Sequence, residues 1–95
     1  MQLQPEHAQI VRKVFGAVLP GAQVWVFGSR ATGKARPFSD LDLLVTQPPK
    51  LTWAQRADLS DAFEESALPF LVDVVPISEL APGFAQRVHG ERVAL

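Results

Sequence analysis

Two short motifs in the middle of the chain have the residue types that bind phosphates and divalent metals. Gly28-Ser29 is the first, and Asp40-Leu41-Asp42 follows it after ten intervening residues. A glycine turn offers backbone N–H groups to a phosphate at close range. Two carboxylates at i and i+2 on a strand share one face and repel each other, and a divalent cation relieves that repulsion. Because oxygen ligands suit Mg²⁺ or Mn²⁺ better than zinc, the motifs predict metal-dependent nucleotide chemistry.

A third carboxylate, Asp73, lies in the otherwise apolar run of residues 70–75. A charge in a core strand is costly unless it is paired or ligated, so we expect Asp73 to join the other two aspartates. The alternative is an aspartate at the edge of a sheet that faces water. Three carboxylates can hold two metal ions about 3.5–4 Å apart, which is the arrangement that stabilises the attacking and the leaving oxygen in phosphoryl transfer.

Basic and hydroxyl side chains between the motifs are candidates for contacts to a triphosphate. Arg30 and Lys34 follow the Gly-Ser pair, and Ser39 directly precedes the aspartate pair. We expect these three residues, together with Gly28 and Ser29, to bind the nucleotide, because cationic side chains form strong hydrogen bonds to phosphate.

Each of these motifs also has an ordinary explanation when taken alone. Gly-Ser is a common turn dipeptide, the two aspartates could begin a solvated strand, and single basic residues in a loop are commonly solvated. The order of the motifs and their positions on the expected elements favour one functional site.

The elements that must position these residues alternate along the chain. An apolar stripe that includes Val11 and Phe15 has helical periodicity and ends at Pro20-Gly21. A capping box of Thr52 and Gln55 opens a later helix, in which we expect Trp53, Ala57 and Phe63 to face inward. We expect helices at about residues 5–19, 29–35, 52–66 and 82–88, and strands at about residues 24–27, 40–46 and 70–75.

The positions of the motifs constrain the topology. The Gly-Ser pair ends the first strand and the aspartate pair begins the second, so these strands must run antiparallel if the motifs share a site. The helix after the second strand is long enough for a parallel crossover to the third. We therefore predict an α+β fold with α/β-type alternation, in the order α-β-α-β-α-β-α, and a small mixed sheet packed with helices.

Composition sets further bounds. The 95 residues, 47% hydrophobic and 20% charged, predict one globular domain over residues 1–95. A net charge of −1 gives no general attraction to nucleic acid, and we expect neither nucleic acid nor a membrane as a partner. The chain has no cysteine, no apolar run of membrane-spanning length and no signal-peptide pattern at its start, so we expect a cytoplasmic protein.

The segment GSRATGKARPFSDLDLLV, residues 28–45, resembles the minimal nucleotidyltransferase (MNT) domains of the DNA polymerase β-like nucleotidyltransferase superfamily. Residues 72–75 resemble the strand that carries the third carboxylate of that family, and residues 90–95 resemble the usual end of its domains. The resemblance implies that Asp40 and Asp42 bind two Mg²⁺ ions and that Asp73 binds the one that activates the acceptor hydroxyl. It also implies a triphosphate held by Gly28 and Ser29.

The resemblance further implies a reaction in which a hydroxyl attacks the α-phosphate of ATP, accepts AMP and releases pyrophosphate. One departure from the family is Thr32, where a second arginine is common. Minimal nucleotidyltransferases of this kind are commonly antitoxins that modify a small helical HEPN-type ribonuclease toxin. The short chain leads us to expect the acceptor on such a partner or on a second copy in a homo-oligomer. Alternatives are a non-catalytic antitoxin or binding module, and the catalytic subunit of a two-chain enzyme that modifies a small hydroxyl compound resembling an aminoglycoside.

Overall fold

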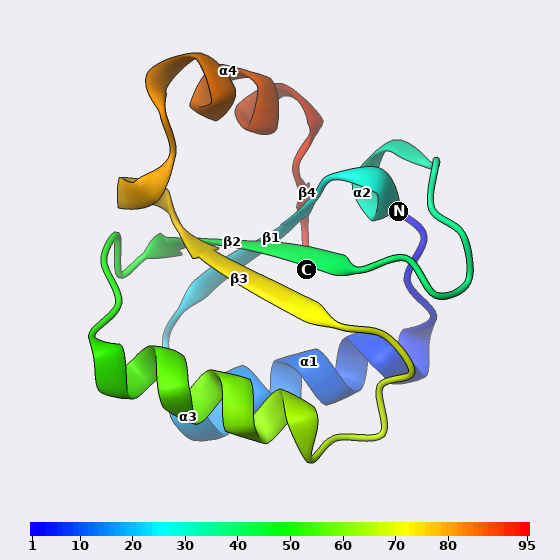
Figure 1. Cartoon of the computed structure of the whole chain (residues 1–95), viewed down its shortest axis with the longest axis vertical. Helices are drawn as coiled ribbons and strands as arrows, with labels where there is room; N and C mark the ends of the chain where they lie inside the picture. Colours follow the sequence, from blue (N-terminus) through cyan, green and yellow to red (C-terminus); the bar gives the residue numbers. More distant parts are fainter.

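The computed structural model describes residues 1–95 and shows a four-stranded sheet with helices on both faces (Figure 1). The sheet order is β3-β2-β1-β4. The strands are β1 (Gln23–Phe27), β2 (Leu41–Gln47), β3 (Val72–Pro76) and β4 (Val93–Ala94). The helices are α1 (Pro5–Val18), α2 (Ser29–Thr32), α3 (Trp53–Glu64), the 3₁₀ helix η1 (Ile77–Glu79) and α4 (Pro82–Glu91).

The strand directions confirm the mixed sheet expected from the sequence. β1 and β2 run antiparallel, and β2 and β3 run parallel, with α3 as the crossover. β4 pairs antiparallel with the free side of β1 and was not predicted. As a result, the end of β1 and the beginnings of β2 and β3 meet at the same end of the sheet.

The main core lies between the sheet and the two long helices, α1 and α3, which cover the lower face in Figure 1. The helical stripe of α1 contributes Val11 and Phe15, and α3 contributes Leu59 and Phe63. The alternation of β2 sends three of its side chains into this core and the others to the opposite face. These three core side chains are Leu41, Leu43 and Val45.

A smaller core lies on the upper face, beneath α4. Val88 of α4 packs with Phe27 and Leu44 of the sheet, and part of η1 packs against this cluster. α4 and η1 cover the ends of β2 and β3 at which these strands stop, whereas the ends at which they start lie open (Figure 1). The open part of this face is where the carboxylates are found.

The expected orientation of α3 was correct at Phe63, which is buried, and wrong at Trp53. Trp53 is 84% exposed because it is the first residue of the helix, beyond the edge of the core. The capping box of Thr52 and Gln55 forms as predicted. Ala57 is half-buried.

No helix of this structure combines the length and the apolar character that crossing a membrane requires.

Candidate active site

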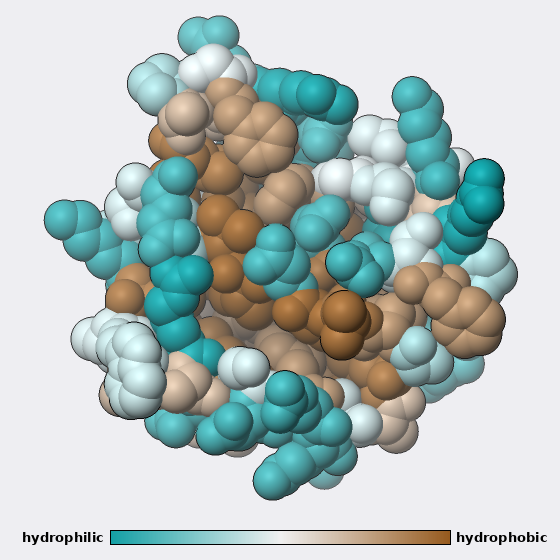
Figure 2. All heavy atoms as spheres, viewed as in Figure 1, coloured by the Kyte–Doolittle hydropathy of each residue, from teal (hydrophilic) through white to brown (hydrophobic).

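The three aspartates lie together at one end of the upper face of the sheet. Asp42 of β2 is directly opposite Asp73 of β3 in the parallel register, and Phe27 at the end of β1 is opposite Asp42 on the other side. Asp40 lies two residues before Asp42, just outside β2. In the view of Figure 1, Figure 2 shows a group of hydrophilic side chains near the middle of the molecule, bordered by hydrophobic surface. The sequence prediction that Asp73 lies beside the strand of Asp42 is therefore confirmed.

The environment of Asp42 disfavours its ionised form. Partial burial raises the pKa of Asp42, and the negative charges of Asp73 and then Asp40 raise it further. A perturbed carboxylate with like charges beside it is typical of functional sites.

The donor set fits a hard divalent cation in chemistry and in register, because it consists of carboxylate oxygens on adjacent strands. The side chains themselves do not converge, since no group of three or more His, Cys, Asp or Glu residues is close enough to hold a metal ion. Asp40 and Asp73 are both exposed, so their side chains are free to rotate toward Asp42.

The sequence argument for Asp73 was wrong in one respect. Asp73 is exposed rather than buried, because β3 is the edge strand of the sheet and its upper face is uncovered at this point. A cavity of about 480 Å³ lies along this edge and is lined by Asp40 and Asp73 together with Glu64, Leu71 and other residues. The third carboxylate therefore faces a space that an acceptor can reach from solvent.

Gly28 joins the glycine turn to the carboxylates. Its φ of 73° lies in the region that favours glycine, and it caps the short helix α2. A Cβ atom at this position would overlap Oδ2 of Asp42. The backbone N–H of Gly28 donates a hydrogen bond of 3.2 Å to Oε1 of Glu91. The glycine turn therefore lies directly against one of the three carboxylates, that of Asp42.

The other residues expected to bind nucleotide lie in different surroundings. Ser29 is half-buried at the first position of α2, next to Gly28. Lys34 is exposed just beyond the end of α2. The Ser39 hydroxyl accepts a hydrogen bond of 2.8 Å from the Arg36 backbone N–H and so closes the loop before Asp40.

Arg30 occupies an internal position that differs from the phosphate-facing one expected from the sequence. It is 6% exposed, and its guanidinium donates to the backbone carbonyls of Gln2, Pro37 and Ser39 at 2.7–3.1 Å. The same group lies 4.0 Å from the centre of the Phe70 ring. Burial lowers the pKa of Arg30, and the nearby Asp40 opposes that shift. Since its donors are directed at the loop, Arg30 positions the segment that leads into Asp40.

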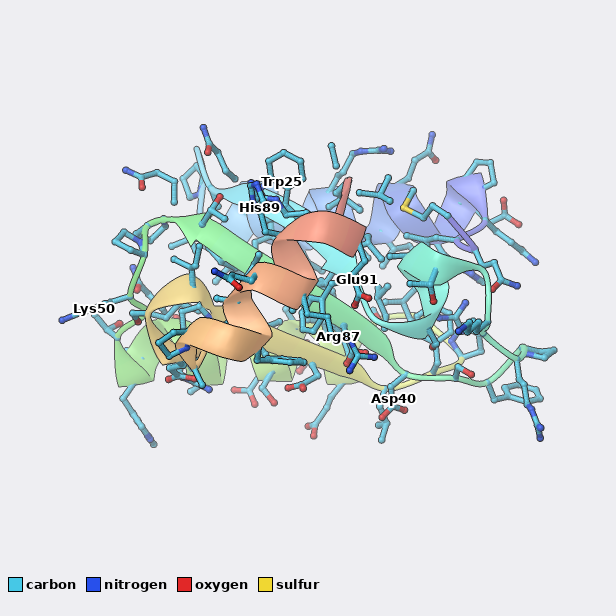
Figure 3. The ribbon with its side chains drawn as sticks, turned by 90° about the horizontal axis from the view of Figure 1, so that it is seen from above. Trp25, Asp40, Lys50, Arg87, His89 and Glu91 are labelled. Atoms are coloured by element: carbon cyan, nitrogen blue, oxygen red, sulfur yellow. The ribbon has the colours of Figure 1, made fainter.

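Two residues of α4 at the site were not found from the sequence. Glu91 accepts the Gly28 N–H, and its second oxygen lies 4.0 Å from Nε of Arg87. Figure 3 shows Arg87 and Glu91 on the side of α4 that faces the end of the sheet where Asp40 lies. The i, i+4 spacing of an arginine and a glutamate is common on solvated helices, so the sequence offered no signal for this contact.

Comparison with known proteins gives the class of protein to which this fold and site correspond. Residues 5–95 match the family model of the nucleotidyltransferase domain, and the chain belongs to this family. It is a nucleotidyltransferase.

Particular relatives extend this result. The chain is 35% identical over 89 residues to MntA of Haemophilus influenzae, which is classed as a probable protein adenylyltransferase, covering 94% of this chain and 78% of the relative. It is similar to the solved structure of a proposed minimal nucleotidyltransferase, with 38% identity, a TM-score of 0.74 and coverage of 100% of this chain and 97% of the other. A mutant of the MntA-HpeT toxin–antitoxin matches with 25% identity and a TM-score of 0.75, covering 99% and 72%.

A toxin–antitoxin solved with AMP-PNP shares the fold, with 24% identity, a TM-score of 0.74 and coverage of 90% of this chain and 69% of the other.

Proposed function

We propose that this protein transfers AMP from ATP to a hydroxyl group of a partner protein, with Mg²⁺ held by Asp40, Asp42 and Asp73. The observation that carries the proposal is the placement of Asp42. It lies opposite Asp73, in contact with Gly28, and beside charges that raise its pKa. A site of this kind combines a phosphate-binding turn with carboxylates that need a cation.

Each residue has a defined task in this proposal. The Gly28 and Ser29 turn holds the β- and γ-phosphates, and Lys34 remains a candidate for neutralising their outer charge. Asp40 and Asp42 bind two Mg²⁺ ions, which supply charge neutralisation at the α-phosphate when bound. Asp73, at the exposed edge, serves the incoming hydroxyl. The acceptor hydroxyl gives up its proton to solvent and its oxygen forms a bond to the α-phosphorus. The bond from the α-phosphorus to the α,β-bridging oxygen breaks, and pyrophosphate leaves with that oxygen while the turn stabilises its charge.

The partner is proposed from the relatives and from the shape of the site. The Haemophilus relative is named as a protein adenylyltransferase, and MntA-HpeT is described as a toxin–antitoxin. The cavity beside Asp73 is open along the edge strand, which leaves room for a segment of another protein. We therefore propose that the acceptor is a small helical toxin of the HEPN type, that this chain is its antitoxin, and that both act in the cytoplasm as one pair.

The test is transfer of label from α-³²P-ATP to the co-expressed partner. We expect Mg²⁺-dependent labelling of the partner by the wild type, and loss of labelling with Asp40→Ala or Asp42→Ala. Arg12→Ala, an exposed residue of α1 on the other face of the sheet, is the control and should label normally. Labelling that survives both aspartate substitutions contradicts the proposal. Full neutralisation of the partner without labelling favours a non-catalytic antitoxin instead.

A further inference from the structure

The carboxylate of Glu91 binds the glycine turn at the position expected for a phosphate. One of its oxygens accepts the Gly28 N–H at 3.2 Å, and the other faces Nε of Arg87 at 4.0 Å. This carboxylate therefore lies between a backbone N–H that donates to it and a guanidinium within ion-pair distance, and both kinds of group also bind phosphates. The carboxylate is therefore an internal stand-in for a phosphate at this position.

From this contact we infer that Arg87 is a triphosphate-binding residue and that Glu91 is the carboxylate which a phosphate displaces when the nucleotide binds. The inference rests on the proposed function, because it takes the Gly28 turn as the triphosphate site. It adds two residues from α4, an element that the sequence motifs do not include.

The basic residues near the turn differ in whether their guanidinium groups are free to bind a phosphate. Arg30 is buried and donates to three backbone carbonyls, so its guanidinium is not free to bind a phosphate. The side chain of Arg87 is 76% exposed, and its one charged neighbour is the carboxylate that contacts Gly28. The Glu91 side chain is 21% exposed, which keeps it beside the turn. Arg87 is therefore the basic residue that the structure links to the glycine turn, through Glu91.

The negative charges at the site explain why a phosphate that binds the Gly28 N–H must displace Glu91. Asp40, Asp42 and Asp73 already place three negative charges at this end of the sheet, and Glu91 adds a fourth. A phosphate cannot share the Gly28 N–H with Glu91, because two anions at one donor repel each other. When a triphosphate with its Mg²⁺ takes the Gly28 N–H, the Glu91 carboxylate must move away, and Arg87 is released to pair with the phosphate oxygens.

The test is calorimetric titration of the full chain with AMP-PNP in the presence of Mg²⁺. Glu91→Gln removes the competing charge and should tighten binding about threefold or more. Arg87→Met removes a charge-assisted contact and should weaken binding about tenfold or more, with Arg87→Lys between it and the wild type. Arg12→Met and Glu6→Gln change the same charges on α1, on the other face of the sheet, and should leave binding unchanged.

Three results separate the possible failures. If the wild type binds no nucleotide, the proposed function fails and this inference fails with it. If the wild type binds and Glu91→Gln binds no more tightly, Glu91 only supports the turn and the inference is overturned. If Arg87→Met binds as well as Arg12→Met, Arg87 does not contact the triphosphate. Because the Arg87 side chain is largely exposed, Arg87→Met should fold normally and keeps the inference testable even if a Glu91 variant does not.

Discussion

Replacing Arg30 by methionine separates a structural role for this residue from a role in binding phosphate. The guanidinium is 6% exposed, donates four hydrogen bonds to the carbonyls of Gln2, Pro37 and Ser39, and stacks on Phe70. Hydrogen bonds from a charged donor contribute about 1.5–3 kcal/mol each when taken alone. The total is smaller than their sum, because Gln2 and Pro37 are exposed and water can reach their carbonyls in the variant.

We therefore expect Arg30→Met to lower the free energy of unfolding by about 3 kcal/mol. For a chain of this size, each kcal/mol corresponds to a Tm change of about 4–8 °C, so Tm should fall by roughly 10–25 °C. Arg30→Lys keeps the charge but not the planar fork, and should recover less than half of the loss.

The assay is urea and thermal unfolding of both variants beside Arg36→Met. Arg36 is the matched control, because it lies in the same loop but its side chain is exposed; its loss should change stability by less than about 0.5 kcal/mol. The reasoning is refuted if Arg30→Met unfolds like Arg36→Met. A normal Tm together with weakened nucleotide binding would instead return Arg30 to the phosphate role expected from the sequence.

Other predictions concern the carboxylates, the glycine turn and α3. The pKa of Asp42 is higher in the folded state than in the unfolded state, so the native state binds the proton more tightly. In metal-free buffer, the free energy of unfolding should therefore fall as pH rises from the ordinary aspartate pKa through the raised one. Asp42→Asn should remove that fall in urea titrations across this range. Mg²⁺ at about 100 times its Kd should stabilise the wild type by about 2.7 kcal/mol and Asp42→Asn by much less, as measured by Tm in a metal titration. Gly28→Ala should cost more stability than Gly33→Ala in urea unfolding, because Gly28 lies against Asp42 and its backbone (φ 73°, ψ −154°) lies outside the left-handed region that Gly33 (φ 81°, ψ 14°) occupies; equal losses would contradict this account. Trp53→Ser should leave stability within about 0.5 kcal/mol, and a larger loss in thermal unfolding would mean that Trp53 packs in the core.

The sequence predicted the parts of the site that depend on the backbone. The assumption of a shared site predicted the antiparallel pair, and the crossover length predicted the parallel pair, so both strand directions were accessible without coordinates. The sequence also placed Asp73 beside the second strand, but the exact Asp42–Asp73 register came from the structure. β4 was missed because two residues carry too little periodic pattern to predict a strand, and its partner, β1, is distant in sequence.

Side-chain roles that depend on tertiary contacts were not accessible in the same way. The apolar run around Asp73 predicted burial, but the run forms an edge strand whose aspartate faces solvent. Arg30 was expected to bind the nucleotide, whereas the loop folds around it and, with Gln2, supplies its carbonyl partners. Glu91 lies 63 residues from Gly28, and no local pattern predicts a contact at that separation.

The central claim is that Asp40, Asp42 and Asp73 and the Gly28 turn form one metal–nucleotide site. The most direct measurement is a crystal structure with Mn²⁺ and AMP-PNP, in which anomalous scattering locates the metal. We predict Mn²⁺ bound by the three carboxylates, with the triphosphate on the Gly28 and Ser29 turn. Metal bound away from these aspartates, or a triphosphate bound elsewhere while the turn keeps its contact with Glu91, would contradict the claim.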